Sequence, residues 1–248
     1  MLGWFRTLFH SVPSPGLKKI RNDFLAMLET ARQEFATACL VALDGEEAES
    51  LRENLLALDK TVNKSERQIR KELVVHCSVQ GTVDPESLVM MSIAKDAERL
   101  GDYSKNIFDM GTICPFLPEG DDRVRLLVLR ASIDKVFVDA ISACDRQDED
   151  FARQIISECV WLAKQCDRNT ERLLRLDTPD CHTAADVLMF RFMKRMTSHL
   201  KNICSSVVQP VHKLDFTSKI TKGMDTKSGD LLDRREMLGE GEFEAKEA

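Results

Sequence analysis

Apolar residues recur every three or four positions over most of the chain, which predicts six long amphipathic helices. The second apolar segment is the most regular, because its leucine and valine positions alternate spacings of four and three. This alternation is typical of a coiled-coil-like seam. The expected helices span about residues 17–43, 46–77, 85–110, 122–144, 149–176 and 183–208.

Turn-forming residues separate the six helices and divide them into two sets of three. Asp84 is a candidate N-cap, and Pro85 suits the first position of the third helix. The stretch from Gly111 to Gly120 holds two prolines and is the strongest internal boundary. The expected organisation is an apolar N-terminal arm (1–16), three-helix units at 17–112 and 121–212, and a flexible acidic tail (213–248).

The two sets of helices echo each other in sequence. At a constant offset, four positions of the third helix match four of the sixth: Ile93, Leu100, Asn106 and Ile107 with Met189, Met196, Asn202 and Ile203. Any two amphipathic helices share some matches, but the common Asn-Ile pair and element order favour duplication of one unit. The predicted fold is therefore all-α, with two tandem three-helix bundles related by a pseudo-twofold repeat.

The composition is typical of a helical globular protein, and it argues against several classes of function. Hydrophobic residues make up 43% of the chain, charged residues 31% and aromatic residues only 6%. The net charge of −6 argues against a general nucleic-acid-binding protein. The eight cysteines form no CxxC pair, which indicates buried thiols in a reducing, cytoplasmic compartment. No nucleophile-elbow, P-loop, dinucleotide-binding or HExxH motif occurs, so we expect no enzyme.

The two ends of the chain differ from its helical body. Residues 1–12 are apolar and include Trp4 and Phe5, and no apolar run is long enough to span a bilayer. This arm either contacts a membrane surface peripherally or packs on the bundle or on a second copy in a homodimer. Packing is favoured, because one short segment binds lipid weakly. The acidic C-terminal end is expected to be disordered, with one short helix around 231–238.

Two like charges and a glycine meet in the middle of the third helix. Glu98 and Asp102 are four residues apart, so their Cβ atoms lie roughly 6 Å apart on one helix face. Gly101 between them costs about 1 kcal/mol relative to alanine. Such penalties at one point predict a bound cation, a close helix contact or a basic partner.

The second helix offers matching polar groups on the flank of its apolar seam. If the second and third helices pack antiparallel, Asp59 and Asn63 can meet Glu98 and Asp102. Carboxylate and amide oxygens suit a hard cation such as Mg²⁺, Ca²⁺, Mn²⁺ or iron. The alternative is a solvated acidic flank that nearby lysines and arginines balance.

Arg99 and Glu66 lie on the same flanks and are the candidate partner-binding residues. Arg99 could meet a phosphate or cross the groove to a carboxylate. An ordinary surface ion pair, which contributes little, is the alternative.

The run from Glu98 to Ile107, Glu-Arg-Leu-Gly-Asp-Tyr-x-x-Asn-Ile, resembles the signature of the PhoU family of bacterial phosphate-transport regulators. Family members carry two three-helix units and bind metal through Glu/Asp-x-x-x-Asp pairs. This chain departs from that pattern, since Asn63 stands where many members have Asp, and Lys194 and Ser198 replace the carboxylates in the second unit. The resemblance therefore implies at most one metal site, in the first unit.

The resemblance also implies a regulator of phosphate uptake that binds rather than catalyses. Its partner would be a membrane phosphate transporter or a sensor kinase, met at the inner face of the membrane. Two other classes stay open: a helical adaptor unrelated to phosphate, and a metal-dependent hydrolase or metal store.

Overall fold

The computed structural model describes residues 14–115, 120–179, 181–215, 220 and 229–238. These residues form six long helices and two short 3₁₀ helices, and no strand occurs among them. The long helices are α2 (Pro15–Asp44), α3 (Ala48–Gln80), α4 (Pro85–Ile113), α5 (Gly120–Arg146), α6 (Glu149–Leu174) and α7 (Cys181–Val208). The 3₁₀ helices are η1 (Val211–Lys213) and η2 (Leu231–Met237). The predicted all-α fold is confirmed.

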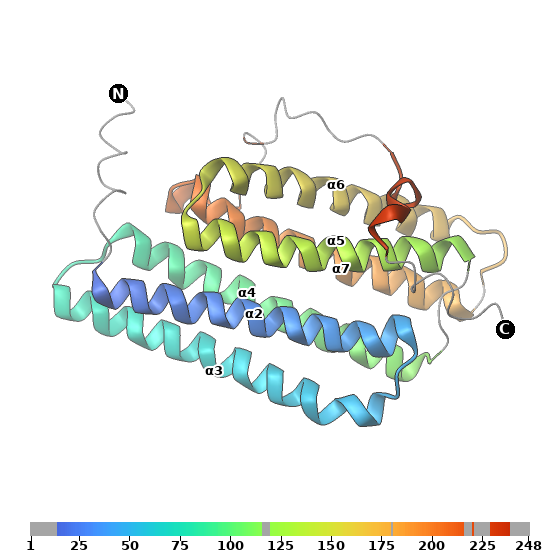
Figure 1. The fold of residues 1–248 in the computed structure, drawn as a ribbon, viewed down its shortest axis with the longest axis horizontal. Helices are drawn as coiled ribbons and strands as arrows, with labels where there is room; N and C mark the ends of the chain where they lie inside the picture. Colours follow the sequence, from blue (N-terminus) through green and yellow to red (C-terminus); the bar gives the residue numbers. More distant parts are fainter. Residues whose placement is uncertain (1–13, 116–119, 180, 216–219, 221–228, 239–248) are drawn as a thin grey trace.

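The helices form two antiparallel three-helix units that lie side by side (Figure 1). Helices α2, α3 and α4 pack together in the first unit, and α5, α6 and α7 pack together in the second. The units meet where α2 packs against α5 and where α4 packs against α7. In the part of the chain that the structure describes, no helix combines the length and apolarity that a membrane span requires.

The helix boundaries follow from local sequence. Ser14 caps α2, because its hydroxyl accepts a hydrogen bond from the backbone N–H of Leu17. Gly45 ends that helix with a left-handed φ of 78°, which glycine adopts without strain. Asp84 caps α4 as predicted, with its carboxylate 2.8 Å from the backbone nitrogen of Ser87.

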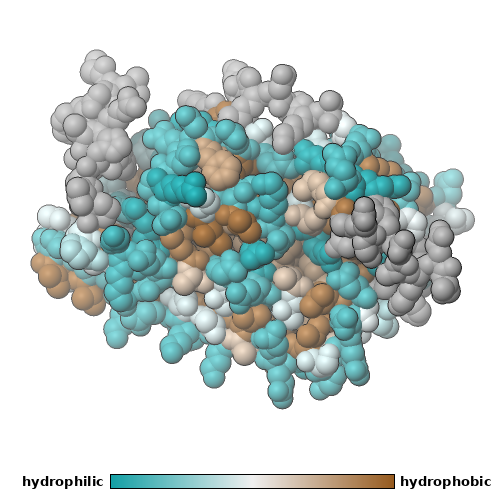
Figure 2. Space-filling model, viewed as in Figure 1, coloured by the Kyte–Doolittle hydropathy of each residue, from teal (hydrophilic) through white to brown (hydrophobic). Residues whose placement is uncertain are grey.

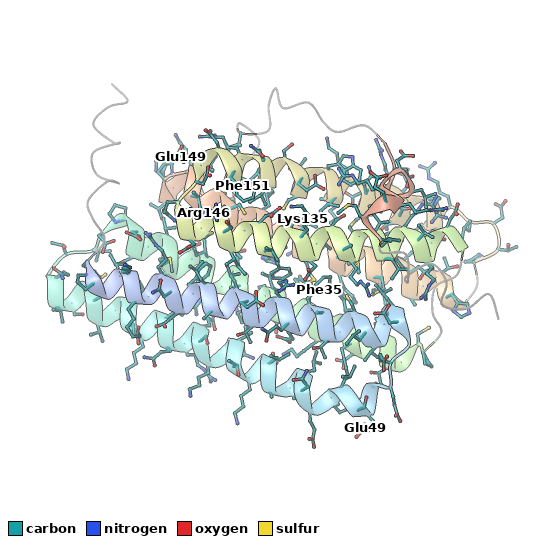
Figure 3. The ribbon with its side chains drawn as sticks, viewed as in Figure 1. Phe35, Glu49, Lys135, Arg146, Glu149 and Phe151 are labelled. Carbon is teal, nitrogen blue, oxygen red and sulfur yellow. The ribbon has the colours of Figure 1, made fainter. Side chains whose placement is uncertain are left out.

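A single apolar core runs through both units. The rings of Phe35 on α2 and Phe137 on α5 stack with their centroids 6.0 Å apart, which joins the two units (Phe35 is labelled in Figure 3). Two described cysteines, Cys77 and Cys114, are partly exposed, and five are buried as expected: Cys39, Cys144, Cys159, Cys166 and Cys204. Burial raises the pKa of the Cys144 thiol to about 12, so this thiol is inert at neutral pH.

The contact between α4 and α7 carries the clearest trace of duplication. Tyr103 and His199 are equivalent positions of the two units, at the offset that relates Asn106 to Asn202, and their rings stack 5.7 Å apart. Asp96 Oδ1 lies 2.7 Å from His199 Nδ1. The residue of α7 that is equivalent to Asp96 is Phe192, and its ring packs on Tyr103 with the ring centroids 6.3 Å apart. The same contact therefore occurs twice, once polar and once apolar.

Gly111 plays a different role from the predicted one. The sequence placed it in the loop after a helix that ended near residue 110, but α4 continues to Ile113 with Gly111 buried inside it. A Cβ atom at this position would lie 2.7 Å from the Cα atom of Ala42 on α2. The glycine therefore permits a close approach of two helix backbones and does not form a turn.

Part of the predicted flexible tail is packed on the second unit. The short helix expected near residues 231–238 exists as η2, which lies against α5. Leu231 is fully buried, and the guanidinium of Arg234 lies 3.5 Å from the ring centroid of Trp161 and forms an ion pair with Glu158. The sequence around Leu231 and Arg234 is polar, so its composition did not indicate that this segment packs on the bundle. The N-terminal arm and the end of the tail lie outside the described residues.

Candidate functional site

The groove between α3 and α4 brings together three of the four predicted metal ligands. Lys105 on α4 lies at its centre, with its ammonium 2.8 Å from Asp59 Oδ1 and 3.5 Å from Asp102 Oδ1. Asn63 donates its amide hydrogen to Asp59 Oδ1 over 3.0 Å. The predicted meeting of α3 and α4 flanks therefore occurs, but around a lysine.

The electrostatics of this cluster favour the charged lysine. Burial lowers the pKa of Lys105, but its hydrogen bond to Asp59 and the nearby charges of Asp59 and Asp102 raise the pKa above its ordinary value overall. The ammonium is therefore held firmly between the two carboxylates. An incoming metal ion would have to displace it.

The fourth predicted ligand, Glu98, belongs to a second lysine cluster. Lys95 lies 2.6 Å from Glu98 Oε2 and 3.9 Å from Glu66 Oε1. Arg99 forms an ion pair with Asp102 at 2.9 Å, along its own helix. Two lysines of α4 thus each join a carboxylate of α3 to a carboxylate of α4. The like charges at Glu98 and Asp102 are relieved because each has its own cation.

A buried carboxyl group that the sequence analysis did not identify completes the site. Glu34 on α2 is fully buried, and neither of its oxygens has a hydrogen-bond partner within the described residues. Burial, with the charges of Asp59 and Asp102 acting in the same direction, raises its pKa to about 8. Glu34 is therefore mostly protonated at neutral pH.

Gly101 is explained by this carboxyl group. A Cβ atom on Gly101 would lie 2.8 Å from Glu34 Oε2, so the buried carboxyl group would have to shift to admit it. Of the three explanations left open, this geometry favours a close helix contact. A sequence signal for Glu34 existed, because it falls between Ala31 and Phe35 in an otherwise apolar stripe of α2.

The fit of this site to a metal ion is incomplete. Within the described ranges, no group of three or more histidine, cysteine, aspartate or glutamate side chains is arranged to hold a metal. The unpartnered oxygens of Glu34, near Asp59 and Asp102, supply hard donors that suit such an ion. The residues can therefore fit a hard cation only once Lys105 has moved away.

In the second unit a lysine again pairs with a carboxylate between two helices, but fewer carboxylates occupy the equivalent positions. Lys194, at the position that matches Glu98, lies 2.6 Å from Asp167 Oδ2, and Asp167 matches Asn63. Ser198, at the position that matches Asp102, donates its hydroxyl hydrogen to the backbone carbonyl of Lys194.

Residues 24–110 match the family model of the PhoU domain. This stretch of the chain is therefore similar to a PhoU domain. The match contains Glu34, both lysine clusters and the run from Glu98 to Ile107, so the family resemblance drawn from that run is confirmed.

Structure comparison extends the likeness to both units. The crystal structure of PhoU from Pseudomonas aeruginosa aligns with a TM-score of 0.66 at 20% identity, over 77% of this chain and 95% of that chain. The two proteins therefore share a fold. No curated protein matches the sequence significantly. The likeness to the PhoU domain implies a role in the regulation of phosphate transport.

Proposed function

We propose that this PhoU-domain protein regulates phosphate uptake by binding a membrane phosphate transporter or its sensor kinase. The match of residues 24–110 to the PhoU domain is the observation that carries this proposal. The surface of α3 and α4 agrees with a binding role, because ion pairs join the two helices and each helix carries a hollow beside them. A hollow of about 430 Å³ is lined by Arg99, Asp102, Tyr103, Lys105, Asn106 and Asp109.

Arg99 and Glu66 are the residues of this groove that we assign to partner binding. About half of the Arg99 side chain is exposed, and its ion pair with Asp102 lies along the surface of α4. An acidic group of a partner can therefore replace Asp102 without unfolding the helix. Glu66 is more buried and is held by Arg70 and Lys95, so a partner would reach it by displacing one of those cations.

We also propose that one hard cation can bind the first unit in competition with Lys105. Its ligands would be Asp59, Asn63 and Asp102, three of the four predicted residues, with Glu34 as an added carboxylate. Glu98 would join them on release from Lys95. The bound ion would supply positive charge that joins α3 to α4, which the ammonium of Lys105 supplies otherwise.

The competition with Lys105 can be measured directly. Isothermal titration calorimetry with Mn²⁺ should show tighter binding to Lys105→Met than to the unaltered protein, because the ammonium no longer blocks the carboxylates. Adding Asp102→Asn to Lys105→Met should weaken that binding again. Lys135→Met, on the second unit, is the matched control. Equal affinity in all four proteins would refute the site.

The regulatory function is tested in cells. Deleting the gene should change phosphate uptake and the phosphate-starvation response, and the unaltered gene should restore both. Arg99→Glu should restore them poorly while leaving the thermal melting of the purified protein unchanged. Normal uptake and a normal starvation response after deletion would overturn the proposal and favour an adaptor unrelated to phosphate. Binding of a partner that ignores metal but fails in Glu98→Lys/Asp102→Lys would also favour the adaptor.

A further inference from the structure

The solvent face of α3 carries a stripe of four basic residues. Their spacings of four, three and four place them on one side of the helix, and all four are exposed: Lys60, Lys64, Arg67 and Lys71. None of them forms an ion pair with another described residue, although Arg67 donates a hydrogen bond to the backbone carbonyl of Asn63. A chain of net charge −6 therefore presents an unbalanced basic surface here.

The basic stripe continues into an exposed apolar end, which we call the valine end. It comprises Val74, Val75, Val79 and Val83, at the end of α3 and in the turn before α4. Val79 is 79% exposed and Val83 is 64% exposed. Figure 2 shows apolar surface at the left, where Figure 1 places this turn. Single exposed apolar residues are ordinary, but four neighbouring valines indicate a contact surface.

The N-terminal arm is attached at the same end of the molecule. A Cβ atom on Gly16, in the first turn of α2, would lie 3.2 Å from the imidazole of His76 near the end of α3. The residues before Ser14 are therefore joined to the chain beside the valine end. Their sequence includes Trp4 and Phe5, residue types that favour the boundary between lipid and water.

We propose that the α3 face from Lys60 to Val83 docks onto the surface of an anionic lipid bilayer. Lysine and arginine side chains are attracted to anionic headgroups, while apolar side chains enter the boundary between headgroups and acyl chains. At 1.5 Å per residue, the helix from Lys60 to Val79 offers a contact about 28 Å long. Glu49 and Glu53 lie at the other end of the same face, so the valine end approaches the lipid first (Glu49 is labelled in Figure 3).

The equivalent face of the second unit lacks these features, so they are not a by-product of duplication. At the offset that aligns Leu55 with Cys159, the basic stripe corresponds to Lys164, Arg168, Glu171 and Arg175. Glu171 stands where the first unit has the basic residue Arg67, and it forms an ion pair with Arg175. Helix α6 ends at Leu174, before any counterpart of the valine end. An acidic protein partner would account for the bases but not for the valines, which is why the bilayer is favoured.

The proposed lipid contact rests on the proposed function only for its biological meaning, because it would bring the regulator to the membrane. The test with lipid vesicles contains neither transporter nor kinase. Failure to bind vesicles would therefore leave the phosphate role untouched, and a normal phosphate response after gene deletion would leave the lipid contact untouched.

The test is flotation of the full-length protein with vesicles of phosphatidylcholine alone or mixed equally with phosphatidylglycerol. The protein should float only with the anionic vesicles. Lys60→Glu/Lys64→Glu should weaken binding by at least about 25-fold, because each lost basic charge accounts for about fivefold. Lys164→Glu/Arg168→Glu changes the net charge equally at the equivalent positions and should bind normally. Val75→Ser/Val79→Ser should also bind more weakly.

Three outcomes would overturn the proposal: no flotation of the unaltered protein, equal loss in both charge-reversal variants, or loss only in Trp4→Ala/Phe5→Ala. The last outcome would make the arm the anchor and leave α3 without a role. Hydrogen–deuterium exchange can be measured on the unaltered protein, so its result does not depend on whether a variant folds. Anionic vesicles should slow exchange over residues 60–83 more than over 164–174, and equal exchange would contradict the proposal.

Discussion

Replacing Glu34 with glutamine should remove a pH dependence from the stability of this protein. The side chain is fully buried without hydrogen-bond partners, and its pKa rises from 4.5 to about 8 in the folded state. Between these two values the folded protein keeps a proton that the unfolded chain releases. The free energy of unfolding therefore falls as pH rises through this window, and it levels off above about pH 8.

The size of the effect follows from the same two values. A shift from 4.5 to about 8 corresponds to about 5 kcal/mol, at about 1.4 kcal/mol for each pH unit. This figure is an upper bound, because small movements of the helices can admit water to the ionised carboxylate. The carboxyl group is fully buried, and its Oε2 atom lies 2.8 Å from the point that a Cβ atom on Gly101 would occupy. A loss of about 2 kcal/mol or more between pH 5 and pH 8 is therefore expected.

Urea unfolding followed by circular dichroism, in the presence of a chelator, measures this effect at several pH values. The stability of Glu34→Gln relative to the unaltered protein should rise from pH 5 to pH 8 and then stay constant. Glu53→Gln makes the same chemical change at an exposed position of α3 and should show no such rise. A constant difference between Glu34→Gln and the unaltered protein at every pH would refute a buried, protonated Glu34.

Three further substitutions test the packing. Gly111→Ala forces a Cβ atom to within 2.7 Å of the α2 backbone and should cost about 1–3 kcal/mol or more, measured by urea unfolding. Gly101→Ala should also destabilise the protein, and much of that loss should vanish when Glu34→Ala is present, giving a coupling of at least about 0.5 kcal/mol in a double-mutant cycle. Additive losses would contradict the contact. Arg234→Ala removes an ion pair and a cation–π contact with Trp161, so it should alter Trp161 fluorescence and lower stability by about 1–2 kcal/mol.

The helices and their order could be predicted because the signals for them are local. Apolar spacing and end-capping residues depend only on neighbours in sequence, so the cap at Asp84 and the 3 + 3 arrangement were found correctly. Gly111 was assigned wrongly because a glycine near prolines favours a turn, whereas its actual role depends on the distance to α2. The packed helix η2 shows the same limit. Its anchoring contact with Trp161 joins residues far apart in the chain.

The candidate site was predictable in part for the same reason. The spacing of Glu98 and Asp102, and their position beside the flank of α3, followed from helix periodicity. The contact between Lys105 and Asp59 depends on how far the antiparallel helices are shifted along each other, which periodicity does not determine. The position of Glu34 beside this site was harder to predict, because Glu34 lies on a third helix, α2.

Charge balance links the proton on Glu34 to the proposed metal site. With Glu34 protonated, Asp59 and Asp102 face the positive charges of Lys105 and Arg99, so the cluster is neutral without a metal. Ionisation of Glu34 adds one buried negative charge, which a hard cation can neutralise better than a lysine that is already paired. Because the cation and the proton compete for Glu34, metal affinity should increase with pH up to about 8 and then stop increasing. In Glu34→Gln this increase should be absent, so one carboxyl group sets both the pH dependence of stability and the pH dependence of metal affinity.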